Sequence, residues 1–158
     1  MLVPTINAIM RSPFWKTTAI IVMYDDSDGW YDHQMSAIVN SSAFASPSDP
    51  SDSDQLNGPG KCGNGPPLGG IQGRCGYGPR LPLLVISPFA KRNFVDHTLT
   101  DQSSVLAFIE DNWGTTRIGG GSFDELADSL LNMFDFDAAH TFKEDRRLFL
   151  DETTGQPR

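Results

Sequence analysis

The stretch TTAIIVMYDDSDGWYDH, residues 17–33, joins an apolar run to an acidic loop, and it decides the fold. Residues 19–23 are apolar and rich in β-branched side chains, with no polar alternation. That pattern is typical of a strand covered on both faces in a parallel sheet. We therefore predict a central parallel strand over residues 17–24, followed by a loop at its carboxyl end over residues 25–33.

A second buried strand is predicted from LPLLVISPF, residues 81–89. The pattern also predicts three helices: an amphipathic one from Leu2 that stops at Pro13, one capped by Thr100 or Asp101 that ends at Gly114, and one that begins at Ser122. Two strands and a long connection indicate an α/β fold. Two strands are too few for a stable sheet of this kind, so further strands come from another chain or this is only part of a domain.

Residues 41–80 form a long Gly/Pro/Ser-rich segment with almost no periodic apolar content, and we expect an irregular loop there. Cys62 and Cys75 lie thirteen positions apart within it. They form either a disulfide, worth about 3 kcal/mol by loop-closure entropy, or two unpaired thiols. A disulfide would imply an oxidising compartment. Residues 137–158 are expected to form a loose polar tail.

The bulk composition excludes several classes of protein. The 158 residues carry a formal net charge of −8, which argues against binding to nucleic-acid backbones. No apolar run approaches the roughly 20 residues needed to span a bilayer. The N-terminal MLVPTINAIMRSPFW has no basic region before its apolar residues, so we do not expect a signal peptide in this chain.

Two adjacent carboxylates, Asp25 and Asp26, follow the first predicted strand, where open α/β sheets bind ligands. Repulsion between them is relieved either by water or by a divalent cation such as Mg²⁺, Ca²⁺, Mn²⁺ or Zn²⁺. Trp30 and Tyr31 could wall a pocket. His33 could act as a ligand, a general acid or a hydrogen-bond donor to an anion. Asp28 and Asp32 have the pattern of turn-forming residues rather than of ligands.

Two blocks of sequence together resemble a known family. FWKTTAIIVMYDDSDGWYDH and the downstream RCGYGPRLPLLVISPFAKRNFVDHTLTDQSSVLAFIEDNW are similar to the C-terminal part of the bacterial phospholipase C and acid phosphatase phosphoesterases. The likeness covers about residues 3–136. It implies an alkaline-phosphatase-like core sheet, of which this chain holds the C-terminal portion, with residues 1–136 belonging to the catalytic domain.

The resemblance also implies metal-dependent hydrolysis of phosphate esters or phospholipids by a secreted or periplasmic enzyme. The family's paired metal ligands fall on Asp25 and Asp26. Arg80 precedes the second strand, where a guanidinium could hold phosphate oxygens or could simply brace the loop. A divalent ion would polarise the phosphoryl oxygen.

The chain departs from the family pattern because it lacks the Glu-Asn motif of the ENRSFDHYFG type and the upstream nucleophile. We therefore expect a truncated enzyme with a weakly held metal and little activity alone. An exposed sheet edge would favour a homo-oligomer. The alternative is a non-catalytic fragment that binds a divalent cation, or one that associates with a partner chain.

Overall fold

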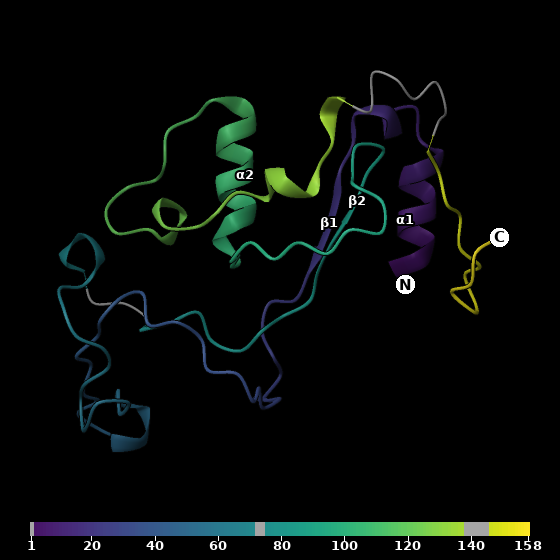
Figure 1. Cartoon of the computed structure of the whole chain (residues 1–158). Coiled ribbons are helices and arrows are strands. Elements are labelled where there is room, and N and C mark those ends of the chain that lie inside the picture. The colour runs from purple at the N-terminus through teal and green to yellow at the C-terminus, as the bar shows by residue number, and fades with distance from the viewer. Residues whose placement is uncertain (1, 72–74, 138–145) are drawn as a thin grey trace. The chain divides into compact units, whose positions relative to one another are not determined.

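The computed structural model describes residues 2–71, 75–137 and 146–158 (Figure 1). The chain divides into two compact units. The strand unit comprises Met1–Tyr24, Pro82–Thr98 and Leu131–Arg158, and the loop unit comprises Asp25–Leu81 and Leu99–Leu130. The acidic pair therefore opens the loop unit, directly after the first strand in the sequence. The secondary structure is of a mixed α/β kind.

The strand unit contains a small sheet in which β1 (Ile20–Met23) pairs with β2 (Leu83–Ile86). The predicted strands are confirmed, but the predicted parallel arrangement is wrong, because the pair is antiparallel with Ile20 opposite Ile86. Full coverage on both faces is wrong as well, since Met23 and Leu84 are exposed. An apolar run does not encode strand direction, and antiparallel strands accept a connection of any length.

Helix α1 (Leu2–Arg11) supplies most of the core of the strand unit, and it confirms the predicted amphipathic helix. Ile6 and Met10 lie one turn apart on its inner face and are buried together with Trp15. Partly buried side chains from both strands and from the C-terminal segment pack against this cluster. Figure 1 shows α1 lying alongside the strand pair.

The C-terminal segment, residues 146–158, is tied to α1 and so differs from the loose tail that the sequence predicts. The side chain of Asn7 is fully buried; it donates to the carbonyl of Leu150 at 2.8 Å and accepts from the Leu150 amide at 3.1 Å. The indole of Trp15 donates to the carbonyl of Arg146 at 2.8 Å. The first part of the predicted tail, residues 138–145, lies outside the described residues.

The loop unit contains α2 (Ser103–Trp113). The N-cap position is Gln102, whose side chain makes no capping bond, rather than the predicted Thr100 or Asp101; the carboxylate of Asp101 accepts from the amide of Ser103 at 2.8 Å. Gly114 ends the helix in the left-handed conformation, as predicted. Buried side chains on α2 include Ala107 and Phe108.

The helix predicted from Ser122 is wrong. The segment instead forms two short 3₁₀ turns, Phe123–Glu125 and Leu130–Met133. Asp124 is buried, and its carboxylate accepts from the amide of Ile118 at 2.9 Å. Hydrogen bonds from nearby backbone amides to an Asp side chain compete with helical hydrogen bonds. This contact therefore favours a turn over a regular helix.

The described part of residues 41–80 contains 3₁₀ helices at Pro50–Asp52 and Leu68–Gly70. Gly69 and Gly121 bring two loops into close approach: a Cβ on Gly69 would lie 2.8 Å from the amide nitrogen of Gly121. Both have a positive φ, so glycine suits each position. None of the described helices has the length and apolar character that crossing a bilayer requires.

Candidate functional site

The aspartate loop, residues 25–36, begins with the two carboxylates singled out in the sequence. Asp25 and Asp26 are both exposed. The side chain of Asp26 accepts from the amide of Asp28 at 2.5 Å. The backbone carbonyl of Asp25 accepts from the side-chain amide of Gln102, the residue before α2. The start of the loop is therefore anchored through the backbone of Asp25, and the carboxylate of Asp26 is held within the loop by the Asp28 amide.

A tight turn follows the acidic pair. Asp28 and Gly29 both have positive φ values, 49° and 78°, and the amide of Trp30 donates to the carbonyl of Ser27 at 2.9 Å. Two successive left-handed residues closed by this bond have the signs of a type I′ turn, which favours an Asp-Gly pair. The turn confirms the prediction for Asp28. The two aromatic residues that follow lie in the solvent: Trp30 is 82 % exposed and Tyr31 is 81 % exposed.

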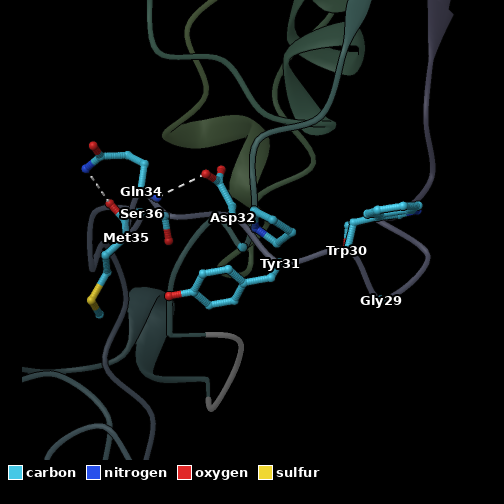
Figure 2. A pocket seen from close by; sticks show the side chains of 10 residues that line it. Gly29, Trp30, Tyr31, Asp32, Gln34, Met35 and Ser36 are labelled. Atoms are coloured by element: carbon cyan, nitrogen blue, oxygen red, sulfur yellow. Dashed lines mark hydrogen bonds between the residues drawn. The ribbon is translucent and has the colours of Figure 1, made fainter.

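These aromatic residues line an open hollow of about 440 Å³ (Figure 2). Its other walls come from later residues of the aspartate loop, including Asp32, Gln34 and Met35, and from Gly78 and Pro79. Figure 2 shows Tyr31 between Trp30 and the Gln34–Ser36 segment. Trp30 and Tyr31 thus contribute to a pocket wall, as the sequence suggested, and the hollow combines apolar surface with a few polar groups.

Asp32 and Arg80 form a bidentate ion pair at the edge of this hollow. The guanidinium donates through Nε and Nη2 to the two carboxylate oxygens at 2.8 and 2.7 Å. The amides of Arg80 and Gln34 donate to the same carboxylate at 2.9 and 3.0 Å. Hydrogen bonds from Arg80 and from these amides hold the pKa of Asp32 well below its ordinary value. The ion pair joins Arg80 to the aspartate loop, and phosphate binding by its guanidinium stays a prediction.

His33 lies at the end of the quoted motif and is exposed. Its ring meets the ring of Tyr31 edge-on, with 5.1 Å between the two centroids. This contact positions the imidazole beside the hollow wall and leaves it accessible to solvent.

The residues present fit part of a metal site but not a whole one. Across residues 2–71, 75–137 and 146–158, no group of three or more His, Cys, Asp or Glu side chains is gathered so as to hold a metal ion. Asp25 and Asp26 supply hard oxygen donors next to each other in the chain, which is suitable for a divalent cation. Further ligands are required for a stable site.

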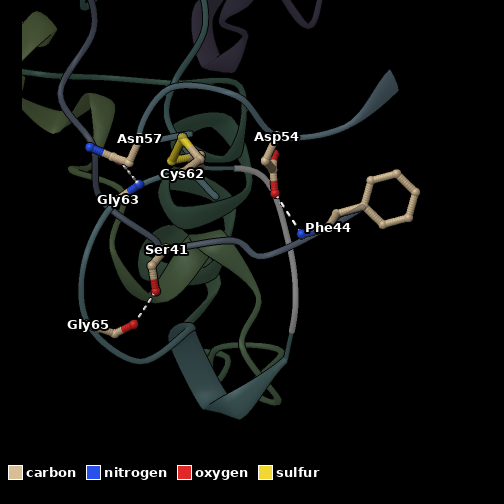
Figure 3. The surroundings of a disulfide bond; sticks show 8 residues. Ser41, Phe44, Asp54, Asn57, Cys62, Gly63 and Gly65 are labelled. Carbon is tan, nitrogen blue, oxygen red and sulfur yellow. Dashed lines mark hydrogen bonds between the residues drawn. A yellow bond between two sulfur atoms is a disulfide. The ribbon is translucent and has the colours of Figure 1, made fainter. Parts of the chain in front are cut away.

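The predicted disulfide is confirmed, since Cys62 and Cys75 are bonded (Figure 3). The segments around both cysteines pair with residues 38–42. Cys62 forms an antiparallel bridge with Ser42, and Gly76, which follows Cys75, forms one with Ile38. Figure 3 shows the neighbouring side-chain bonds, among them Ser41 to Gly65 and Asp54 to Phe44. A largely irregular segment therefore obtains its order from a cross-link and polar contacts.

Sequence reasoning missed two residues of this region. The sequence pattern indicates a turn at Asp32, and the bond from the Gln34 amide confirms that role, but the ion pair of Asp32 reaches a partner 48 positions away. No feature of the sequence singles out Gln102. No local pattern encodes either contact, although GYGPR places the arginine beside a turn-forming Gly-Pro pair.

Comparison with known proteins shows the class to which this arrangement belongs. Residues 1–116 match the Phosphoesterase family. The chain belongs to that family, whose members are hydrolases.

The particular relatives are bacterial phospholipases C. The chain is 33 % identical to the non-hemolytic phospholipase C of Pseudomonas aeruginosa over 118 residues, which cover 69 % of this chain and 16 % of that protein. It is 30 % identical to phospholipase C B of Mycobacterium tuberculosis, over 72 % of this chain and 20 % of the relative. The chain thus matches about a fifth or less of the length of these proteins.

Proposed function

We propose that this chain is part of a metal-dependent hydrolase of phosphate esters, of the phospholipase C or acid phosphatase type. The observation that carries the proposal is the family match over residues 1–116, which includes the exposed acidic pair directly after β1. Phospholipids and other phosphate esters are the substrates we propose. The names of the relatives support this class of substrate.

In this proposal, Asp25 and Asp26 supply two oxygen ligands to a divalent ion, Zn²⁺, Ca²⁺, Mn²⁺ or Mg²⁺. Both side chains are exposed, so they could bind the ion without first being uncovered. The ion would supply Lewis-acid polarisation of the phosphoryl group. We propose that the remaining ligands and the nucleophile belong to parts of the family's chain outside the matched fifth.

The loop's other residues have supporting roles. His33 is proposed as a general acid or as a hydrogen-bond donor to phosphate oxygens, because its ring is exposed beside the hollow. Arg80 is proposed as a bracing residue, because two of its guanidinium nitrogens are engaged by Asp32. Trp30 and Tyr31 offer apolar surface on the wall of the hollow.

The sheet also fits a partial domain. β1 and β2 pair with each other in a two-stranded sheet, which leaves an outer edge on each strand among the described residues. We propose that the pair belongs to a larger alkaline-phosphatase-like sheet, completed by other segments or by a second copy of the chain. The disulfide supports a secreted or periplasmic location for the family's proteins.

Calorimetric titration with Mn²⁺ tests the metal assignment. We expect one weak site in the purified chain that is lost in Asp25→Asn and Asp26→Asn. The matched control is Asp52→Asn, which removes one charge from another exposed aspartate and should leave the titration unchanged. Equal binding by all four proteins would overturn the assignment of the acidic pair.

Turnover of p-nitrophenyl phosphate and of phosphatidylcholine by the same four proteins tests the incomplete site. We expect at most slow hydrolysis by the unsubstituted chain. Fast, metal-dependent hydrolysis that is abolished by Asp25→Asn would show instead that the chain carries a complete site.

A second candidate function is a non-catalytic fragment that binds a divalent cation or associates with a partner chain. The absence of a third ligand among the described residues and the open edges of the sheet favour it. Light scattering after size exclusion distinguishes association from a monomer. A strictly monomeric, inactive chain that still binds Mn²⁺ would leave only the cation-binding form of this candidate.

A further inference from the structure

The carboxylate of Asp32 is unusually well satisfied for a residue in an exposed loop. It accepts four hydrogen bonds: from the amides of Gln34 and Arg80, and from Nε and Nη2 of Arg80. Two carboxylate oxygens offer about four lone-pair positions, so these bonds saturate the group. Its side chain is only 13 % exposed. Asp32 is therefore unsuited to bind a metal ion, in contrast to the exposed Asp25 and Asp26.

Arg80 lies on a segment that is held in place by a disulfide and by backbone contacts. The disulfide holds Cys75 five positions before it. The carbonyl of Cys75 accepts from the amides of Val39 and Asn40, each at 3.3 Å. A bridge between Gly76 and Ile38 adds a further link. The guanidinium thus projects from an anchored segment toward the aspartate loop.

The opposite end of the loop has an anchor of a different kind. The carbonyl of Asp25 accepts from the side chain of Gln102, which precedes α2. Between the two anchors lie the acidic pair, the Asp-Gly turn and the two exposed aromatic residues. The bonds of Asp32 to Arg80 therefore tie the later part of this stretch to a distant segment of the chain.

We propose that Arg80 is a positioning residue, and that its ion pair with Asp32 is a clasp that fixes the geometry of the aspartate loop. The bidentate fork of arginine sets both distance and orientation, which the single ammonium of lysine does not. The consequence for metal affinity rests on the proposed function above. The consequence for loop order does not.

Hydrogen exchange of the backbone amides, followed by mass spectrometry, tests the clasp in the intact chain. Arg80→Lys and Asp32→Asn should each speed exchange in residues 27–36 by about tenfold, because local opening becomes easier. Exchange in α2 should not change. The matched control is Arg158→Ala, which removes a different ion pair, formed with Asp151 at 3.2 Å.

The double variant Asp32→Asn/Arg80→Lys decides whether the two residues act as one unit. If they do, the double variant exchanges no faster than either single variant, because each change removes the same clasp. Exchange in residues 27–36 that is unchanged in the single variants, or rates that multiply in the double variant, would overturn the proposal.

Mn²⁺ titration of the same variants separates the two proposals. With the clasp released and the thermal unfolding midpoint unchanged, we expect Mn²⁺ to bind several-fold more weakly. If the unsubstituted chain binds no Mn²⁺, the metal assignment fails, and the exchange experiment still decides the clasp. If Mn²⁺ affinity is unchanged while exchange is faster, the loop is clasped but the clasp does not position ligands, which contradicts the positioning role.

Discussion

The strand unit and the aspartate loop are ordered by different physical means. In the strand unit, a buried indole and two buried aliphatic side chains pack against a helix, two strands and the C-terminal segment. In the loop, both large aromatic residues are exposed, and order comes from an ion pair, an Asp-Gly turn and hydrogen bonds. Apolar burial stabilises without specifying direction, whereas charged and backbone groups fix orientation. The candidate site thus lies in the aspartate loop, which is ordered by polar contacts rather than by apolar burial.

Removing the buried indole should have the largest effect. Trp15 is 1 % exposed, and Trp15→Ala should lower the free energy of unfolding by about 3–5 kcal/mol, because it leaves a cavity and removes the bond to Arg146. Denaturant unfolding followed by far-UV circular dichroism measures the change. Trp113→Ala is the control, since that indole is 68 % exposed. Equal losses for the two variants would contradict an apolar core centred on Trp15.

Removing the disulfide between Cys62 and Cys75 should weaken the order of the loop unit rather than that of the strand unit. Cys62→Ser/Cys75→Ser opens a disulfide of sequence separation 13, and we expect a loss of about 3 kcal/mol by the loop-closure estimate. Amide exchange should rise in residues 38–42 and 75–80, while α1 keeps its protection. Faster exchange in α1 to the same extent would show that the two regions are not ordered separately.

Titration of Asp151 should give the smallest effect. Bonds from the amides of Thr154 and Thr153 lower the pKa of its carboxyl to about 2. Because the folded pKa is depressed, this contribution to stability is fully present above the ordinary value of 3.8 and is lost as the pH falls through about 2. Carboxyl NMR measures the midpoint. Arg158→Ala should move it only slightly, and a midpoint near 3.8 in the unsubstituted chain would contradict the turn contacts.

The sequence predicted those elements whose determinants are local. The periodicity of Ile6 and Met10 predicts α1, the β-branched runs predict both strands, and Gly114 predicts the end of α2. The same reasoning failed for the segment after Ser122, where Leu130 is fully buried but Leu126 is 41 % exposed. The carboxylate of Asp124 instead accepts from the amide of Ile118, six positions earlier, and a side-chain-to-backbone bond of this kind leaves no periodic signal in the sequence.

The candidate site was predictable to a similar degree. The position of Asp25 and Asp26 after a strand and the disulfide both follow from sequence pattern and spacing. Strand direction and the partner of Arg80 do not, because each depends on residues more than 45 positions apart. The Asp32–Arg80 pair joins two segments that lie 48 positions apart in the chain, and no local pattern encodes a contact of that span.

Paramagnetic broadening by Mn²⁺ in NMR spectra of the chain tests the central assignment most directly. If Asp25 and Asp26 bind a divalent cation, sub-stoichiometric Mn²⁺ should broaden their carboxyl signals first, with nearby amides of the aspartate loop next. The carboxyl of Asp32 should respond less than theirs, because its four hydrogen bonds occupy its oxygens. Broadening that is equal at Asp25, Asp26 and the distant Asp52 would contradict a cation site at the acidic pair.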